Sequence, residues 1–103
     1  MIIHIKNYEE FKEYISNNAC FVDFYTSWCG PCKMLSPIIE ELDENGSFGD
    51  IKILKIDAEE CPDISREFNI QAVPTLMLFK NGKVEKTTMG YMNENDILDF
   101  IKI

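Results

Sequence analysis

Two cysteines separated by two residues, in the segment Cys29-Gly30-Pro31-Cys32, are the residues of this sequence best suited to chemistry. Thiols at this spacing on the first turn of a helix can close a disulfide without disrupting the backbone. Cys29 is predicted at the helix N-terminus, where unpaired N–H groups and the positive end of the helix dipole stabilise a thiolate. Because a thiolate attacks in thiol–disulfide exchange, Cys29 is the predicted nucleophile. Cys32, one turn further and predicted to be more buried, suits the resolving role.

A pair of this kind can also belong to a structural zinc site, which needs a second pair or a Cys/His partner at a defined spacing. The remaining candidates, Cys20, Cys61 and His4, are each isolated, so we predict no metal site. Four cysteines are too few for a secreted domain stabilised by several disulfides. Residues 1–6 are too short for a signal peptide, and an acidic stretch follows them directly. Cysteine usage therefore favours a reducing, cytoplasmic compartment.

Asp23 lies in the middle of an apolar and aromatic run, residues 21–25. A carboxylate is costly to bury and its pKa should then be raised. Simple alternation would place it on a solvated face, but helices expected on both sides of the sheet favour burial. A buried Asp23 could accept a proton from Cys32 when a mixed disulfide is resolved. Lys55 on a neighbouring strand is either its charge partner or a solvated residue at a strand end.

The elements that must position these residues alternate along the chain. Strand patterns cover residues 2–5, 20–25, 51–56, 76–79 and 84–89. The last of these is more polar and is expected at a sheet edge. Helices are expected after Asn7, from the cysteine pair, near Pro62 and after Asn93. The order βαβαβαββα predicts parallel, right-handed crossovers between the buried strands, with Asn81-Gly82 turning a hairpin that adds an antiparallel edge. The predicted fold class is α/β, a three-layer α/β/α sandwich with a central mixed β-sheet.

Length and composition limit the function classes. The chain has 103 residues, which predicts one domain over 1–103, and 46% hydrophobic with 27% charged residues is ordinary for a globular protein. A formal net charge of −8 argues against nucleic-acid binding through a basic face. No apolar run approaches the roughly 18 residues of a membrane helix, and no Gly-rich dinucleotide fingerprint is present. We therefore expect no nucleic acid, no membrane and no bound cofactor.

The segment Trp28-Cys29-Gly30-Pro31-Cys32-Lys33 belongs to a set of features that fall in order along essentially the whole chain. The others are Asp23 in a Val-Asp-Phe setting, Pro37 inside the following helix, Lys55, the loop Val73-Pro74-Thr75, the hairpin Asn81-Gly82, and Gly90 after the last strand. Together they resemble the thioredoxin family, whose redox-active pair would correspond to Cys29 and Cys32. The resemblance implies a thioredoxin-like fold.

The same resemblance implies a protein-disulfide reductase that acts on disulfide-containing protein substrates. Cys29 would attack the substrate, and Cys32 would then displace the reduced product from the mixed disulfide. A thioredoxin reductase drawing on NADPH would re-reduce the resulting disulfide, so that the chain would use NADPH only indirectly. A cytoplasmic monomer is expected.

A substrate-facing rim is expected around the cysteine pair. The resemblance implies a cis bond before Pro74, which would leave the backbone of Val73 free to pair with an extended substrate, although most X–Pro bonds are trans. Trp28 either packs in the core or forms part of the rim, and Tyr91 is either part of it or a plain surface aromatic. The expected substrate-binding residues are Trp28, Gly30, Pro31, Val73, Pro74, Gly90 and Tyr91.

Some positions depart from the commonest family pattern. Tyr25 occupies a place often held by a second tryptophan, and Thr26-Ser27 replaces the usual small and acidic pair, changes expected to tune partner choice. Cys20 is expected to pack as a small apolar residue. Cys61 lies near a predicted helix start and is either exposed and reactive or inert. In having a cysteine at this position, the chain resembles some eukaryotic thioredoxins, but the general behaviour of non-catalytic cysteines favours an inert residue.

The sequence argues against two other functions. A disulfide-forming oxidant or isomerase is disfavoured by Pro31, because oxidising relatives usually differ at the dipeptide between the cysteines. A binding subunit that uses the fold only for docking is disfavoured by the intact cysteine pair and by Asp23.

Overall fold

The computed structural model describes residues 1–102, so that only Ile103 of the predicted domain lies outside the described residues. The elements follow the predicted order and are β1 (Ile2–His4), α1 (Tyr8–Asn17), β2 (Cys20–Tyr25), α2 (Gly30–Glu44), β3 (Lys52–Asp57), α3 (Pro62–Glu67), β4 (Thr75–Lys80), β5 (Lys83–Met89) and α4 (Glu94–Phe100). No helix within residues 1–102 is long and apolar enough to span a membrane.

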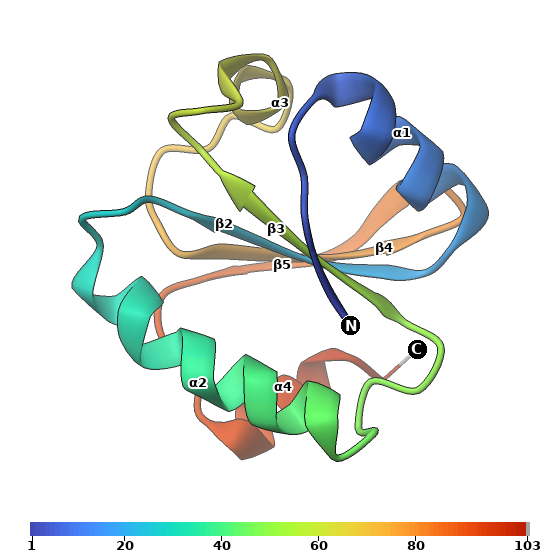
Figure 1. Ribbon diagram of the computed structural model, residues 1–103, viewed down its shortest axis with the longest axis vertical. Helices are drawn as coiled ribbons and strands as arrows, with labels where there is room; N and C mark the ends of the chain where they lie inside the picture. The colour runs from blue at the N-terminus through green and yellow to red at the C-terminus, as the bar shows by residue number, and fades with distance from the viewer. Residues whose placement is uncertain (103) are drawn as a thin grey trace.

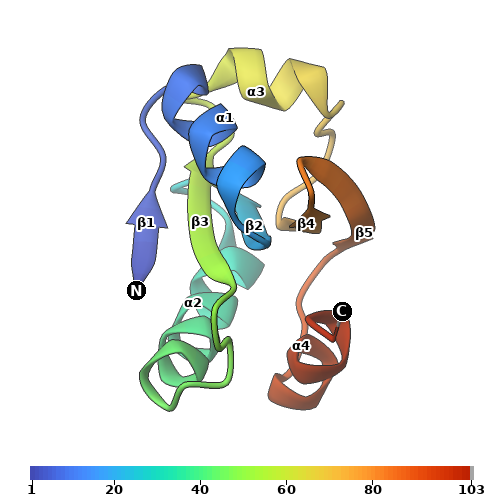
Figure 2. The same cartoon turned by 90° about the vertical axis from the view of Figure 1, so that its right-hand side faces the viewer.

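The strands form one mixed sheet in the order β1-β3-β2-β4-β5. Strands β1 and β2 run parallel to β3, while β4 is antiparallel to β2 and β5 is antiparallel to β4. Helices α1 and α3 cover one face, and α2 and α4 cover the other (Figures 1 and 2). The predicted three-layer sandwich and the edge position of β5 are confirmed.

The direction of β4 corrects the prediction that the third crossover would join parallel strands. Helix α3 has six residues and rises only about 9 Å, whereas β4 also has six residues and extends about 20 Å. The helix alone therefore does not carry the chain back along the sheet, and the connection over residues 58–74 begins and ends at the same end of the sheet. Accordingly, Asp57 at the end of β3 pairs with Tyr25, and Thr75 at the start of β4 pairs with the adjacent Phe24. The end of β3 and the start of β4 therefore lie at the same end of the sheet.

The apolar core is divided by the sheet into two clusters, and β2 contributes to both. Val22 and Phe24 pack on the α1/α3 side, while Phe21 packs with Leu35 of α2 on the other side. Because side chains alternate along a strand, Asp23 faces the same layer as Phe21, the layer that contains α2. The fold therefore places a carboxylate beneath the helix that begins at the cysteine pair.

The hairpin between β4 and β5 forms where the sequence predicts it. Asn81 and Gly82 have φ angles of +55° and +77°, the left-handed conformations that a two-residue turn of this kind requires. The helix starts are also as predicted, because the side chains of Asn7 and Asn93 accept backbone hydrogen bonds from the first turns of α1 and α4. Helix α2 continues through Pro37.

Candidate active site

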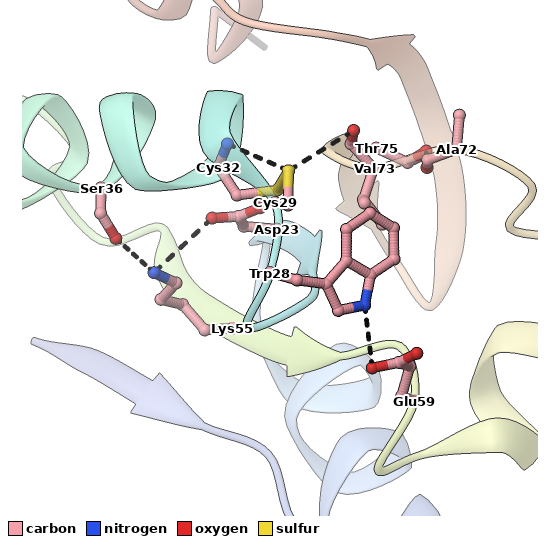
Figure 3. Close-up of a disulfide and its surroundings, with 10 residues drawn as sticks. All are labelled: Asp23, Trp28, Cys29, Cys32, Ser36, Lys55, Glu59, Ala72, Val73 and Thr75. Carbon is pink, nitrogen blue, oxygen red and sulfur yellow. Dashed lines mark hydrogen bonds and ion pairs between the residues drawn. A yellow bond between two sulfur atoms is a disulfide. The ribbon is translucent and has the colours of Figure 1, made fainter.

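Cys29 and Cys32 form a disulfide with their Cα atoms 5.3 Å apart (Figure 3). Cys29 is the N-cap of α2, as predicted, and its Sγ accepts a hydrogen bond of 3.1 Å from the backbone N–H of Cys32. This donor is one of the unpaired N–H groups at a helix start, and it would stabilise negative charge on the same sulfur in the reduced protein.

The prediction that Cys29 is more exposed than Cys32 is wrong. Their exposed fractions are 3% and 4%, so both are buried. The loop before β4 covers Cys29, because the carbonyl oxygen of Val73 lies 3.7 Å from its Sγ. The two cysteines are therefore distinguished by their positions on the helix and not by their burial. Gly30 and Pro31, between them, are exposed.

The loop beside Cys29 has a cis peptide bond between Val73 and Pro74, as the resemblance implies. The Thr75 hydroxyl donates a 2.6 Å hydrogen bond to the carbonyl of Ala72 and closes this loop. The backbone N–H of Gly90 donates to the carbonyl of Pro74 at 2.9 Å, which ties the end of β5 to the same loop. Gly90 has a φ of +94°, a conformation that favours glycine. Three predicted rim positions are thus brought together beside Cys29.

The Trp28 side chain is 67% exposed, so the alternative that it packs in the core is wrong. Its indole Nε1 donates a 3.2 Å hydrogen bond to the carboxylate of Glu59, which follows β3 (Figure 3). Trp28, Glu59 and Val73 help to line a hollow of about 250 Å³. Tyr91 is 47% exposed. The role of Glu59 as partner of Trp28 was not predicted from the sequence. Two signals could have indicated it: an exposed indole N–H favours a hydrogen-bond acceptor, and an acidic pair follows β3.

Asp23 is fully buried, which excludes the solvated-face alternative. Within residues 1–102, neither of its carboxylate oxygens has a hydrogen-bond partner. Lys55 is its charge partner, with its Nζ 3.9 Å from Oδ2 of Asp23. Loss of hydration raises the pKa of Asp23 to about 6, and the positive charge of Lys55 opposes this shift. The site thus contains a carboxyl group that changes protonation close to physiological pH.

Two further side chains hold Lys55 and were not predicted. Its Nζ donates a 2.5 Å hydrogen bond to Oγ of Ser36 on α2, and it lies 4.9 Å from the centre of the Tyr25 ring. Cys32, Ser36 and Lys55 help to line a pocket of about 210 Å³. No sequence signal distinguishes Ser36 from other polar helix residues, because its contact with Lys55 depends on how α2 packs on the sheet.

The remaining cysteines are separate from this site. Cys20 is fully buried, and burial raises its pKa to about 11. Cys61 is only 4% exposed and its thiol lies 3.8 Å from the carbonyl oxygen of Ile5, so the exposed alternative is wrong. Burial, aided by the nearby carboxylates of Asp63 and Asp57, raises the Cys61 pKa. In the described part of the chain, no three His, Cys, Asp or Glu side chains are grouped as a metal ion would require.

Comparison with known proteins places these features in a family. The family model named thioredoxin matches residues 2–103. A thioredoxin of Rickettsia felis is 48% identical over 86 residues, which cover 84% of this chain and 81% of the relative. A thioredoxin of Mycoplasmoides gallisepticum is 36% identical over 96% of this chain and 98% of its own length. The oxidised form of mitochondrial thioredoxin 3 from Saccharomyces cerevisiae superposes with a TM-score of 0.86 at 35% identity, covering 97% of this chain and 92% of that one.

Proposed function

We propose that this chain, which belongs to the thioredoxin family and reduces protein disulfides by thiol–disulfide exchange, uses Cys29 as the attacking thiol and Cys32 as the resolving thiol. The observation that carries this assignment is the hydrogen bond from the Cys32 N–H to the Cys29 Sγ at the start of α2. It favours the thiolate at Cys29, and thiolate is the form that attacks a disulfide.

The reaction then has two displacements. The Cys29 thiolate attacks one sulfur of the substrate disulfide, and the other substrate sulfur leaves with the bonding electrons and takes up a proton. The Cys32 sulfur, after losing its proton, attacks the Cys29 sulfur of the mixed disulfide and releases the second substrate thiol. The substrate gains two electrons and two protons, and the chain is left with the Cys29–Cys32 disulfide present in this structure.

Asp23 is the proposed acceptor of the Cys32 proton. Its support is the position of Asp23 on β2, facing the layer that contains α2, together with its burial and a pKa raised to about 6. A base of this strength is ionised at neutral pH and takes up a proton more readily than an exposed aspartate. Lys55 stabilises the ionised form through its charge, 3.9 Å away.

The substrate is proposed to bind across the rim that surrounds the disulfide. Gly30 and Pro31 are exposed next to the cysteines, and Trp28 offers a flat apolar surface. An extended substrate segment would pair with the backbone of Val73, as a strand pairs with a sheet edge. The remaining proposed contacts are Pro74, Gly90 and Tyr91.

The proposed partners are disulfide-containing proteins and a thioredoxin reductase that draws on NADPH. The chain itself needs no bound cofactor, because the electrons are stored in the cysteine pair. A formal net charge of −8 supports the proposal that nucleic acid is not a partner. We further propose that the chain acts as a monomeric single domain in the cytoplasm.

Trapping of mixed disulfides tests the roles of the two cysteines. A Cys32→Ser variant should accumulate a dithiothreitol-sensitive conjugate with a disulfide substrate such as insulin, whereas Cys29→Ser should form none. Trapping by Cys29→Ser alone would reverse the assignment. Turnover of insulin by the wild-type chain with NADPH and a purified thioredoxin reductase tests the proposed electron source, and turnover with dithiothreitol in its place is the control.

A further inference from the structure

We propose that Ser36 is a positioning residue whose hydroxyl holds the Lys55 ammonium 3.9 Å from Asp23 and keeps this ion pair from closing to hydrogen-bond distance. The catalytic meaning of this arrangement rests on the proposed function, in which Asp23 accepts the proton of Cys32. The arrangement itself is a property of three side chains from three elements: Ser36 on α2, Lys55 on β3 and Asp23 on β2.

The distances show which partner Lys55 has. Its Nζ lies 2.5 Å from the Ser36 Oγ, a hydrogen bond, but 3.9 Å from the nearer oxygen of Asp23, which is beyond hydrogen-bond range (Figure 3). Both oxygens of this buried carboxylate lack a hydrogen-bond partner within residues 1–102. An unsatisfied buried carboxylate favours any donor within reach, so a free Lys55 would be expected to move toward it. Ser36 supplies the competing acceptor.

The supports of Lys55 come from both sides of the pair. Ser36 lies four residues after Cys32 on α2, so the two share one face of the helix. Tyr25 lies two residues after Asp23 on β2, on the same side of the strand, and its ring contacts the ammonium at 4.9 Å. The aromatic ring attracts the cation but offers no oxygen acceptor on its face, which leaves Ser36 as the hydrogen-bonding partner.

The other groups around Asp23 give it little compensation. Lys55 on β3 is its only positively charged neighbour among the described residues, Tyr25 on β2 is neutral at physiological pH, and α2 contributes Cys32. Its register partner on β4 is the apolar Leu76, and α4 contributes apolar side chains to this layer of the core. Loss of hydration has the largest influence on the proton affinity of the carboxyl group, and the charge of Lys55, which depends on its separation from Asp23, is the contribution that opposes it.

Loss of the Ser36 hydroxyl should let this separation close. Shortening it from 3.9 Å to about 2.8 Å, at an effective dielectric constant of about 20, lowers the pKa of Asp23 by roughly one unit. The acid dissociation constant would then rise about tenfold, and Asp23 would become a weaker base. The acid limb of the pH profile for resolution should move down by the same unit.

The test compares Ser36→Ala with Ser36→Thr in the oxidised protein, following the Asp23 carboxyl carbon by NMR across a pH titration. The wild type and Ser36→Thr should titrate together, and Ser36→Ala roughly one unit lower. In a Lys55→Met background, Ser36→Ala should cause no further shift. An unchanged or raised pKa in Ser36→Ala would overturn the proposal. Alanine is the best helix former, so the variant should fold, which circular dichroism checks.

A second measurement separates this inference from the proposed function. If Asp23→Asn resolves mixed disulfides at the wild-type rate, the proposed catalytic role of Asp23 fails, while the carboxyl titration still decides whether Ser36 positions Lys55. If Asp23→Asn slows resolution and the Asp23 pKa is insensitive to Ser36→Ala, the function stands and the positioning role is rejected.

Discussion

Replacement of Asp23 by asparagine should stabilise the protein at neutral pH and leave its stability almost unchanged in acid. Asp23 is fully buried, and loss of hydration raises its pKa from 3.8 to about 6. The folded protein therefore binds this proton more tightly than the unfolded chain does. Between about pH 4 and pH 6 the folded state carries more protons, so its stability falls as the pH rises through that range.

The magnitude follows from the difference between the two pKa values. A shift of about two pKa units corresponds to about 3 kcal/mol of lost folding stability. This cost is present in full above the folded-state pKa and absent well below pH 3.8. Asparagine has nearly the shape of the protonated acid and never ionises, so it avoids this cost. Near pH 8 the Asp23→Asn variant should therefore unfold with a free energy up to about 3 kcal/mol higher, which raises the melting temperature on the order of 10 °C.

Urea unfolding of the oxidised protein between about pH 4 and pH 8 measures this difference directly. An Asp50→Asn variant, at an exposed aspartate, is the matched control and should follow the wild type throughout. The reasoning is refuted if Asp23→Asn is no more stable than the wild type near pH 8. It is equally refuted if the gain in stability stays constant down to pH 4, because a pH-independent effect would be one of packing.

Two more predictions concern the cysteines. A Pro31→His variant should have a reduction potential higher by on the order of tens of millivolts, because histidine can donate a hydrogen bond or positive charge to the Cys29 thiolate. Equilibration with glutathione, followed by tryptophan fluorescence, measures the potential of each protein. In the folded, reduced protein near neutral pH, iodoacetamide should label Cys29 first and leave Cys20 and Cys61 unmodified. All three thiols are buried, but the start of α2 stabilises the Cys29 thiolate, whereas the pKa values of Cys20 and Cys61 are raised. Peptide mapping would show any equal labelling of Cys61, which would contradict the proposed difference in thiolate stability.

Most of the fold was predictable because its signals are local. The apolar run over residues 20–25 indicates a strand buried on both faces, and Asn81-Gly82 indicates a hairpin whatever the rest of the chain does. The direction of β4 was predicted wrongly, because β4 is antiparallel to β2. A six-residue α3 is too short to span β4 by itself, but the whole connection over residues 58–74 is long enough for a parallel crossover, so its length does not decide the direction of β4.

The site divides in the same way between local and distant signals. The cysteine pair lies within one helical turn, so its chemistry can be inferred from spacing alone. Glu59 and Ser36 meet their partners across 31 and 19 residues of sequence, through contacts set by helix packing and loop position. The burial of Cys29 likewise depends on the loop at Val73, 44 residues away. No pattern within a single element records these contacts.

The proton affinity of the site depends on strand register as much as on residue type. Asp23 and Lys55 are direct register partners in the parallel pair of β2 and β3. A slip of one residue would bring Leu54 or Ile56 opposite Asp23 and turn Lys55 toward the α1/α3 core. Such a slip would also carry apolar side chains away from the clusters in which they are buried. The hydrophobic alternation that stabilises the sheet therefore also fixes the distance on which the Asp23 pKa depends, so core substitutions in β3 should perturb the chemistry of a site they do not touch.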